Sequence, residues 1–61
     1  MKQGNTYMVE FDSGRSIYVY QYTLDQVIQY CKLAYQNDPI KSIFLEVFVK
    51  FQARHLFLVM P

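Results

Sequence analysis

The 61-residue chain has few of the residues that usually stabilise or activate very small proteins. It contains one cysteine, one histidine, two glycines, two prolines and no tryptophan. A single cysteine excludes an intramolecular disulfide, and a single cysteine with a single histidine excludes a cysteine-based zinc site. A domain of this size buries only about 60% of its unfolded surface and commonly needs a disulfide, a metal or a partner chain. Dense packing or self-association is therefore expected to supply the missing stability.

Charge and long apolar runs are also scarce. The formal net charge is +1, which suits neither a polyanion-binding protein nor an acidic DNA mimic. The longest apolar stretch, residues 43–51, is interrupted by Glu46 and Lys50 and is too short to span a bilayer. No apolar run follows the polar opening, as a secretory signal would require, and Met1 resembles a native start. With one free thiol, we expect a cytoplasmic protein.

Apolar and aromatic residues, in contrast, are abundant. Hydrophobic residues make up 52% of the chain and aromatic residues 18%, with six tyrosines and five phenylalanines. This composition is typical of a folded chain and excludes disorder. We expect one domain over residues 1–61, with a loose polar segment at residues 1–6.

Alternating apolar and polar side chains predict the two strands of a β-hairpin, at residues 7–11 and 17–22. A three-residue loop ending at Gly14 pairs Val9 with Ile17 and Tyr7 with Val19. A two-residue loop would instead mix the two faces of the hairpin, because directly opposite residues share a face. The three-residue loop is therefore predicted.

A capping box marks the start of a helix, with Thr23 as N-cap and Gln26 three residues later. The apolar residues that follow have the spacing of one helical face: Leu24, Val27, Ile28, Cys31, Ala34 and Tyr35. Asn37 suits the left-handed position that ends a helix, and Pro39 prevents its continuation.

The remaining chain predicts a second hairpin, with a long strand at residues 40–51 and a last strand at residues 54–60. A turn near Gln52 and Ala53 is expected, although the segment lacks the usual turn residues. An even loop there keeps the aliphatic residues on one face. It pairs Val49 with Leu56, Val47 with Leu58, Leu45 with Met60, and Phe48 with Phe57.

The predicted fold is α+β, with element order β-β-α-β-β. A crossover from the second strand to the third that lands beside the first gives an antiparallel sheet of spatial order 2-1-3-4. One helix is expected to pack on the aliphatic face of this sheet. That face carries Tyr7, Val9, Ile17, Val19, Leu45, Val47, Leu56 and Leu58.

One helix leaves the opposite face of the sheet uncovered, and this face is expected to carry six aromatic residues. Its predicted members are Met8, Glu10, Tyr18, Tyr20, Tyr22, Phe44, Glu46, Phe48, Phe57 and Val59. A solvated face should alternate apolar with polar residues, and an exposed apolar patch of several hundred Å² usually marks an interaction site.

Three interpretations compete for this aromatic face. Tyrosines can decorate an exposed strand, but three phenylalanines beside them are harder to explain in that way. A stacking platform for single-stranded nucleic acid needs a basic rim, whereas Glu10 and Glu46 lie on the face and only Lys50, His55 and Arg15 lie near it. We favour an interface with a second copy or a target protein. The candidate binding residues are Tyr18, Tyr20, Tyr22, Phe44, Phe48 and Phe57, with Tyr30 and Leu33 on the outer helix face as either surface residues or anchors of a second interface.

No catalytic, cofactor or metal site is expected. Cys31 lies within the apolar helix stripe, where a buried thiol is inert, and His55 has no second ligand or activating partner motif. The acidic residues are scattered, without metal-binding spacing, and no glycine-rich phosphate loop is present.

Residues 14–21, Gly-Arg-Ser-Ile-Tyr-Val-Tyr-Gln, resemble a strand of the small dimeric uracil-DNA glycosylase inhibitors encoded by some tailed phages of Gram-positive bacteria. In that family a glycine, a base and a polar residue precede closely spaced tyrosines. The likeness covers roughly residues 7–47 and includes the helix start at Thr23 and Leu24 and an isoleucine-rich strand. It implies a homodimer that encloses a protruding loop of an enzyme in an apolar pocket.

Two features depart from that family. Its members are acidic, whereas this chain carries a charge of +1. Their helix carries two aromatic residues four positions apart, where this chain has Val27 and Cys31, or Ile28 and Lys32. The resemblance therefore assigns no functional role to any individual residue of this chain. The expected function is a non-enzymatic, homodimeric phage or mobile-element inhibitor of a host protein, such as a DNA-processing or defence enzyme. The alternative is a single-stranded nucleic-acid-binding module.

Overall fold

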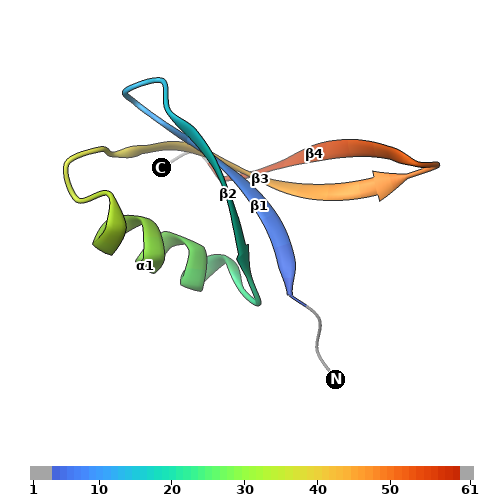
Figure 1. The fold of residues 1–61 in the computed structure, drawn as a ribbon, viewed down its shortest axis with the longest axis horizontal. Helices are drawn as coiled ribbons and strands as arrows, with labels where there is room; N and C mark the ends of the chain where they lie inside the picture. The colour runs from blue at the N-terminus through green and yellow to red at the C-terminus, as the bar shows by residue number, and fades with distance from the viewer. Residues whose placement is uncertain (1–3, 60–61) are drawn as a thin grey trace.

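The computed structural model describes residues 4–59, which form one four-stranded antiparallel sheet and one helix (Figure 1). The elements are β1 (Asn5–Phe11), β2 (Ser16–Gln21), α1 (Leu24–Ala34), β3 (Ile40–Val49) and β4 (Gln52–Val59). The sheet order is β2-β1-β3-β4, so the predicted fold class and strand order are confirmed. β1 begins at Asn5, two residues earlier than predicted, so Asn5 and Thr6 belong to the sheet and not to a loose segment.

The first hairpin has the predicted three-residue loop. Tyr7 pairs with Val19, and the Phe11 N–H donates to the Arg15 carbonyl at 2.9 Å. Gly14 has a φ of +93°, a conformation that side-chain-bearing residues rarely adopt. The glycine therefore fixes the loop length, and the loop length fixes which side chains face the core.

The helix begins as predicted. The Thr23 hydroxyl accepts from the Gln26 N–H at 3.3 Å, and the Gln26 side-chain oxygen accepts from the Thr23 N–H at 3.1 Å. These two bonds satisfy N–H groups that have no partner within the helix.

The predicted helix end is wrong. The last helical residue is Ala34, and Tyr35 caps the helix by donating its N–H to the Cys31 carbonyl at 2.9 Å. Among the described residues, only Lys50 and Phe51 combine a side chain with a positive φ, so Asn37 does not adopt the left-handed conformation. Because Tyr35 already closes the last turn, no left-handed residue is needed there.

Asp38 ties the first hairpin to the connection between α1 and β3. Its carboxylate accepts from the Ser13 hydroxyl at 2.6 Å and lies 3.9 Å from the Arg15 guanidinium. The Asp12 N–H also donates to the Pro39 carbonyl at 2.9 Å. The end of the helix is therefore held against the hairpin loop by several polar contacts.

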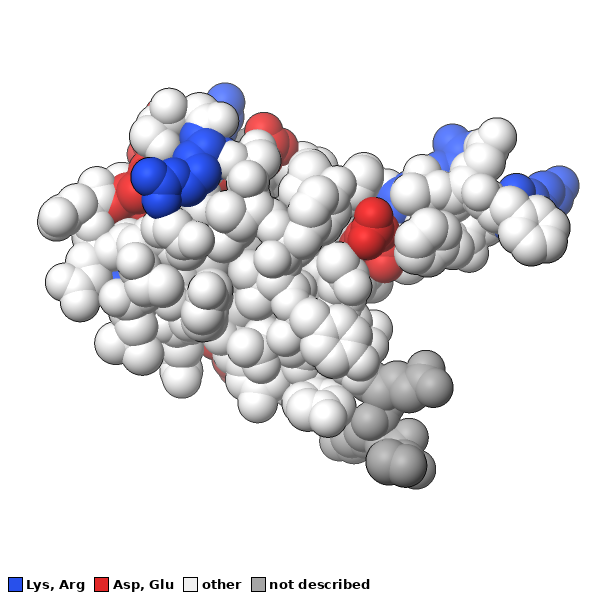
Figure 2. Space-filling view, in the orientation of Figure 1, with Lys and Arg blue, Asp and Glu red and all other residues white. Residues whose placement is uncertain are grey.

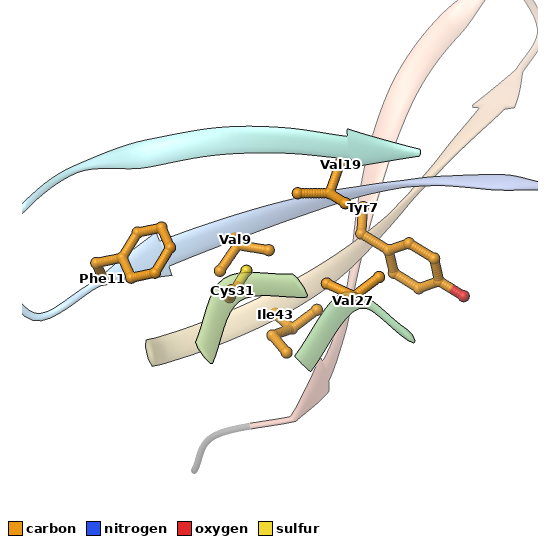
Figure 3. Packing of buried hydrophobic residues seen from close by; sticks show 7 residues of the cluster. All are labelled: Tyr7, Val9, Phe11, Val19, Val27, Cys31 and Ile43. Atoms are coloured by element: carbon orange, nitrogen blue, oxygen red, sulfur yellow. The ribbon is translucent and has the colours of Figure 1, made fainter. Parts of the chain in front are cut away.

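The core lies between α1 and one half of the sheet (Figure 3). Val27 and Cys31 of the helix face the strands there. The buried apolar residues are Tyr7, Val9, Phe11, Val19, Val27, Cys31 and Ile43. They come from β1, β2, α1 and the first half of β3, whereas every side chain described between residues 51 and 58 is exposed.

The second hairpin turns two residues earlier than predicted, at Lys50 and Phe51. Both have positive φ, 52° and 65°, which is the pattern of a two-residue type I′ turn. Leu45 therefore pairs with Leu56 instead of Met60, which lies outside the described residues. The shift is even in number, so the side chains of the hairpin keep their predicted faces.

A β-bulge at Leu58 changes the face only at the end of β4. Phe44 pairs with Phe57, but Ile43 pairs with Val59, so β4 has one extra residue between these two pairs. Val59 thus occupies a register position on the helix side of the sheet, and its predicted place on the opposite face is wrong.

Beyond the core, β3 and β4 continue as an arm, residues 45–58, which projects away from α1 (Figure 1) and is two-stranded over residues 46–55, where neither strand pairs with β1. The radius of gyration is 11.7 Å, above the roughly 10.5 Å typical of a compact chain of this length. An 11-residue helix spans about 16 Å, but a 10-residue strand spans about 33 Å. The helix lies over β1, β2 and the start of β3, so it reaches neither Val47 on the arm nor Leu56 and Leu58 on the edge strand β4, and the prediction that it packs on them is wrong.

Relief of the positive φ at Lys50 should stabilise the protein. Asparagine tolerates the left-handed conformation better than lysine, so we expect Lys50→Asn to raise the free energy of unfolding by about 0.5–1 kcal/mol. Urea denaturation followed by circular dichroism measures the change. Lys50→Ala is the matched control, because alanine removes the same side chain without favouring positive φ. An Asn variant no more stable than the Ala variant would contradict the assigned turn.

Candidate protein-binding surface

Four apolar side chains form a row across all four strands on the face opposite α1, which we call the outer face. Met8 of β1 pairs with Tyr18 of β2 on one side and with Phe44 of β3 on the other, and Phe44 pairs with Phe57 of β4. The next residues along β1, Tyr7 and Val9, point into the core, so strand alternation places this row on the uncovered face. Tyr18 and Phe57 are 60% and 52% exposed.

Side chains of the two edge strands approach each other over the outer face. The rings of Tyr18 on β2 and His55 on β4 lie 6.2 Å apart, although β1 and β3 separate their strands. Phe44 and Phe57 pack edge to face at 5.5 Å. His55 Nε2 also lies 3.6 Å from a Glu46 carboxylate oxygen. The outer face is therefore an aromatic cluster with one acid–imidazole pair beside it.

The structure brings together only some of the predicted site residues. Tyr18, Phe44 and Phe57 lie in the row, and Tyr20 lies two residues further along β2 on the same face, where its hydroxyl accepts from the Gly4 N–H at 3.1 Å. Phe48 shares the outer face but pairs with Ala53 on the arm. The predicted pairing of Phe48 with Phe57 is wrong, because the turn lies two residues earlier.

Three other predicted residues lie away from the row. Tyr22 follows β2 and donates its N–H to the Gln26 side chain at 3.0 Å, at the helix start. Tyr30 and Leu33 lie on α1, on the other side of the sheet, and the Tyr30 ring packs against Tyr35 at 6.5 Å. Leu33 is largely exposed. These residues do not extend the outer face.

Charged groups are arranged unfavourably for an anionic ligand. Glu10 and Glu46 lie on the outer face, and Glu10 is flanked by Ser16 and Ser42 in the register. Figure 2 shows Lys and Arg side chains gathered at the end of the arm and a broad surface without charged side chains over the body of the molecule. Among residues 4–59, no basic rim surrounds the aromatic row.

Catalytic groups do not converge anywhere in the described part of the chain. Burial raises the pKa of the Cys31 thiol, which lies beneath α1, so the reactive thiolate is disfavoured. Within residues 4–59, no three His, Cys, Asp or Glu side chains gather as metal ligands. In the same residues, α1 is too short to cross a membrane.

The structure exposes a second apolar surface, and the sequence did not predict this exposure. We call it the aliphatic stripe: it lies on the helix side of the arm and consists of Leu45, Val47, Val49, Leu56 and Leu58. The helix was expected to cover Leu45, Val47, Leu56 and Leu58; all four lie on the predicted face, but only Leu45 packs against the core. The lengths of the predicted helix and strand already contained the signal, because the strand is about twice as long as the helix.

Comparison of the chain with protein-family models, curated proteins and solved structures finds no match. The resemblance of residues 14–21 to the glycosylase inhibitors therefore stays a prediction.

The burial of Cys31 predicts low thiol reactivity. We expect an aromatic disulfide reagent at pH 8 to label the native thiol about 100-fold more slowly than the same chain in denaturant, because the helix must open first. An exposed reference is Ser13→Cys in a Cys31→Ala background, which should react at the denatured rate. Equally fast labelling of native Cys31 would show that α1 does not hold its place over the sheet.

Proposed function

We propose that this chain is a homodimeric, non-catalytic module that binds another protein through its outer face. The observation that carries this is the uncovered row of Tyr18, Met8, Phe44 and Phe57 across the whole sheet. Aromatic residues and methionine are enriched in the cores of protein interfaces, and exposed patches of this kind usually mark them.

The polar groups on the outer face suit a surface that is exposed to solvent whenever no partner is bound. Tyrosine combines a large apolar ring with a hydroxyl that tolerates water, which favours binding sites over permanent cores. Glu46 and His55 lie 3.6 Å apart next to the row and can exchange this contact for hydrogen bonds to a partner. An interface of this kind is a reversible one.

The target is a host enzyme of DNA processing or defence, and the module inhibits it in the host cytoplasm. This part of the proposal is supported by the resemblance to phage-encoded inhibitors. Tyr18 and Tyr20, which carry the resemblance, both lie on the outer face. A mobile element gains most from a small binder of this type, because it needs no catalytic machinery.

The outer face can be tested with a photo-crosslinking amino acid placed at Phe57. In a lysate of the source cell, we expect one dominant crosslinked protein that excess wild-type chain displaces and that Tyr18→Ser abolishes. The matched control position is Gln29, which is exposed on α1 and lies on the other side of the sheet. Equal crosslinking from Gln29, or capture unaffected by Tyr18→Ser, would overturn the assignment of the outer face.

Single-stranded nucleic acid is the competing ligand, because exposed Phe48 and Phe51 lie near Lys50 and Arg54 on the arm. Base-stacking proteins bind with strong salt dependence. Glu10 and Glu46 on the outer face oppose such binding, so we expect no binding of a 20-nucleotide single strand at about 150 mM salt. Fluorescence anisotropy measures this. A micromolar or tighter complex that weakens with salt and with Tyr20→Ala would replace the protein ligand.

A further inference from the structure

The aliphatic stripe is an exposed surface of leucine and valine side chains that lies outside the buried core. Leu56 is 51% exposed although it shares a face with the buried core, and Val49 and Leu58 are similarly uncovered. A separate groove of about 820 Å³ lies beside α1, and Ile28, Tyr35 and Ile40 line it together with the charged residues Asp12, Lys32, Asp38 and Lys41. Unlike the outer face, the stripe contains neither hydroxyls nor carboxylates.

The aliphatic stripe is a part of the sheet's helix-side face that no second layer of structure covers. A sheet is stable when its apolar face is covered, and here α1 covers only the part formed by β1, β2 and the start of β3. Val49, Leu56 and Leu58 are 49%, 51% and 39% exposed and Leu45 and Val47 are partly buried, so the stripe and the groove margin expose roughly 450 Å² of aliphatic surface. A standard interface buries about 800 Å² per partner, of which about 55–65% is apolar, so the available surface matches one partner's share.

We infer that a second copy of this chain supplies the missing layer, with the aliphatic stripes of two arms packed face to face around a two-fold axis. A two-fold interface places the same patch on both sides, so the patch must complement itself. A surface of leucine and valine meets this condition, whereas a patch dominated by charges of one sign does not. The inference rests on the proposed function only in requiring a homodimer.

An axis near the paired Leu45 and Leu56 fits the dimensions of the chain. Ile40, in the groove, lies five residues before Leu45, and Phe51, at the tip, lies six residues after it. These separations are about 17 and 20 Å along the strand. A two-fold axis that lies between the two sheets and runs across the strands therefore places the tip of each arm beside the groove of the other copy. Phe51, which is fully exposed at 105%, then has apolar surface to contact.

The same axis keeps like charges apart. Arg54 is the charged residue on the helix side of the arm, opposite Val47 and two residues from Leu56. Across the axis, the two copies of Arg54 lie four residues apart, which is roughly 13 Å or more. Arg54 is exposed, and its long side chain can keep the guanidinium in water at the edge of the interface. There the separation exceeds the screening length of about 8 Å at physiological salt. Repulsion therefore does not oppose the packing.

Face-to-face packing of the stripes has a consequence for target binding. The outer faces then point away from each other, on the two outside surfaces of the dimer. Each dimer presents two separate copies of the row that contains Tyr18 and Phe57. The dimer is accordingly bivalent, and dimerisation does not occupy the target-binding surface.

The inferred interface can be tested with substitutions at two pairs of residues, one pair on each face of the arm. Val47 and Leu56 lie on the helix side of the arm, and Phe48 and Phe57 lie on its outer face, with one residue of each pair on β3 and one on β4. Sedimentation velocity at 10 μM should show a wild-type dimer. Val47→Asp and Leu56→Asp should give monomers, whereas Phe48→Asp and Phe57→Asp should remain dimeric.

A milder series guards against loss of folding, which circular dichroism monitors in every variant. Leu56→Ala should raise the dimer dissociation constant at least tenfold, and Phe57→Ala should raise it less than threefold. A folded wild-type monomer at 100 μM overturns the inference, as does a dimer broken by the outer-face variants. Equal effects of Leu56→Asp and Phe57→Asp would assign the dimer to edge pairing of β4 and also overturn it.

These outcomes separate the dimer from target binding. A dimeric Phe57→Asp protein that no longer binds its target supports both surfaces. A Leu56→Asp monomer that still captures the target supports the outer face and the stripe as independent sites. If the dimer has the expected interface but no protein crosslinks to the outer face, the proposed function fails while the inferred dimer stands.

Discussion

The structure depends on one mismatch of length, between a helix of 11 residues and a hairpin whose first strand has 10. The helix is about half as long as the strand, because each helical residue advances 1.5 Å and each strand residue about 3.3 Å. The covered half of the sheet becomes the core around Val9, Val27 and Ile43. The uncovered half becomes the arm. The division between folded core and exposed surface follows from this geometry.

The two faces of the arm differ in a way that indicates different uses. The outer face combines rings with hydroxyl, carboxylate and imidazole groups, so it can remain in water until a partner arrives. The aliphatic stripe has no such groups, so exposure of the stripe carries the full unfavourable free energy of hydrating leucine and valine. Such a surface suits a permanent contact. The chemistry of the two faces therefore favours a stable dimer and a reversible target complex over the opposite assignment.

Local signals made the first half of the fold predictable from the sequence. Gly14 and the alternation around it set the loop and register of the first hairpin, and Thr23 with Gln26 set the helix start. Each of these features depends on residues within a few positions of each other. The strand order followed from a crossover that places β3 beside β1, which makes all neighbouring strands antiparallel.

The second hairpin was less predictable because its turn uses residues that do not favour it. Lys50 and Phe51 adopt positive φ where asparagine and glycine are usual, so nothing local distinguishes this turn from one two residues later. Strand alternation placed Tyr18, Phe44 and Phe57 on the outer face, but their alignment in one row required the actual register. The exposure of the stripe depends on the relative lengths of the helix and the strands. Alternation of side chains shows which face a residue lies on, but it does not show how far the helix extends over that face.

The strained turn and the exposed stripe have a common physical explanation. Two side-chain-bearing residues with positive φ disfavour the arm by about 1–2 kcal/mol each, and an isolated two-stranded ribbon is at best marginally stable in water. The pairs formed by Phe44 with Phe57 and by Glu46 with His55 stabilise the base of the arm, but they lie on one face only. In the inferred dimer, coverage of the other face by a second copy would remove aliphatic surface from water and offset the strain. Order in the arm is then linked to dimerisation, and through mass action to the concentration of the protein.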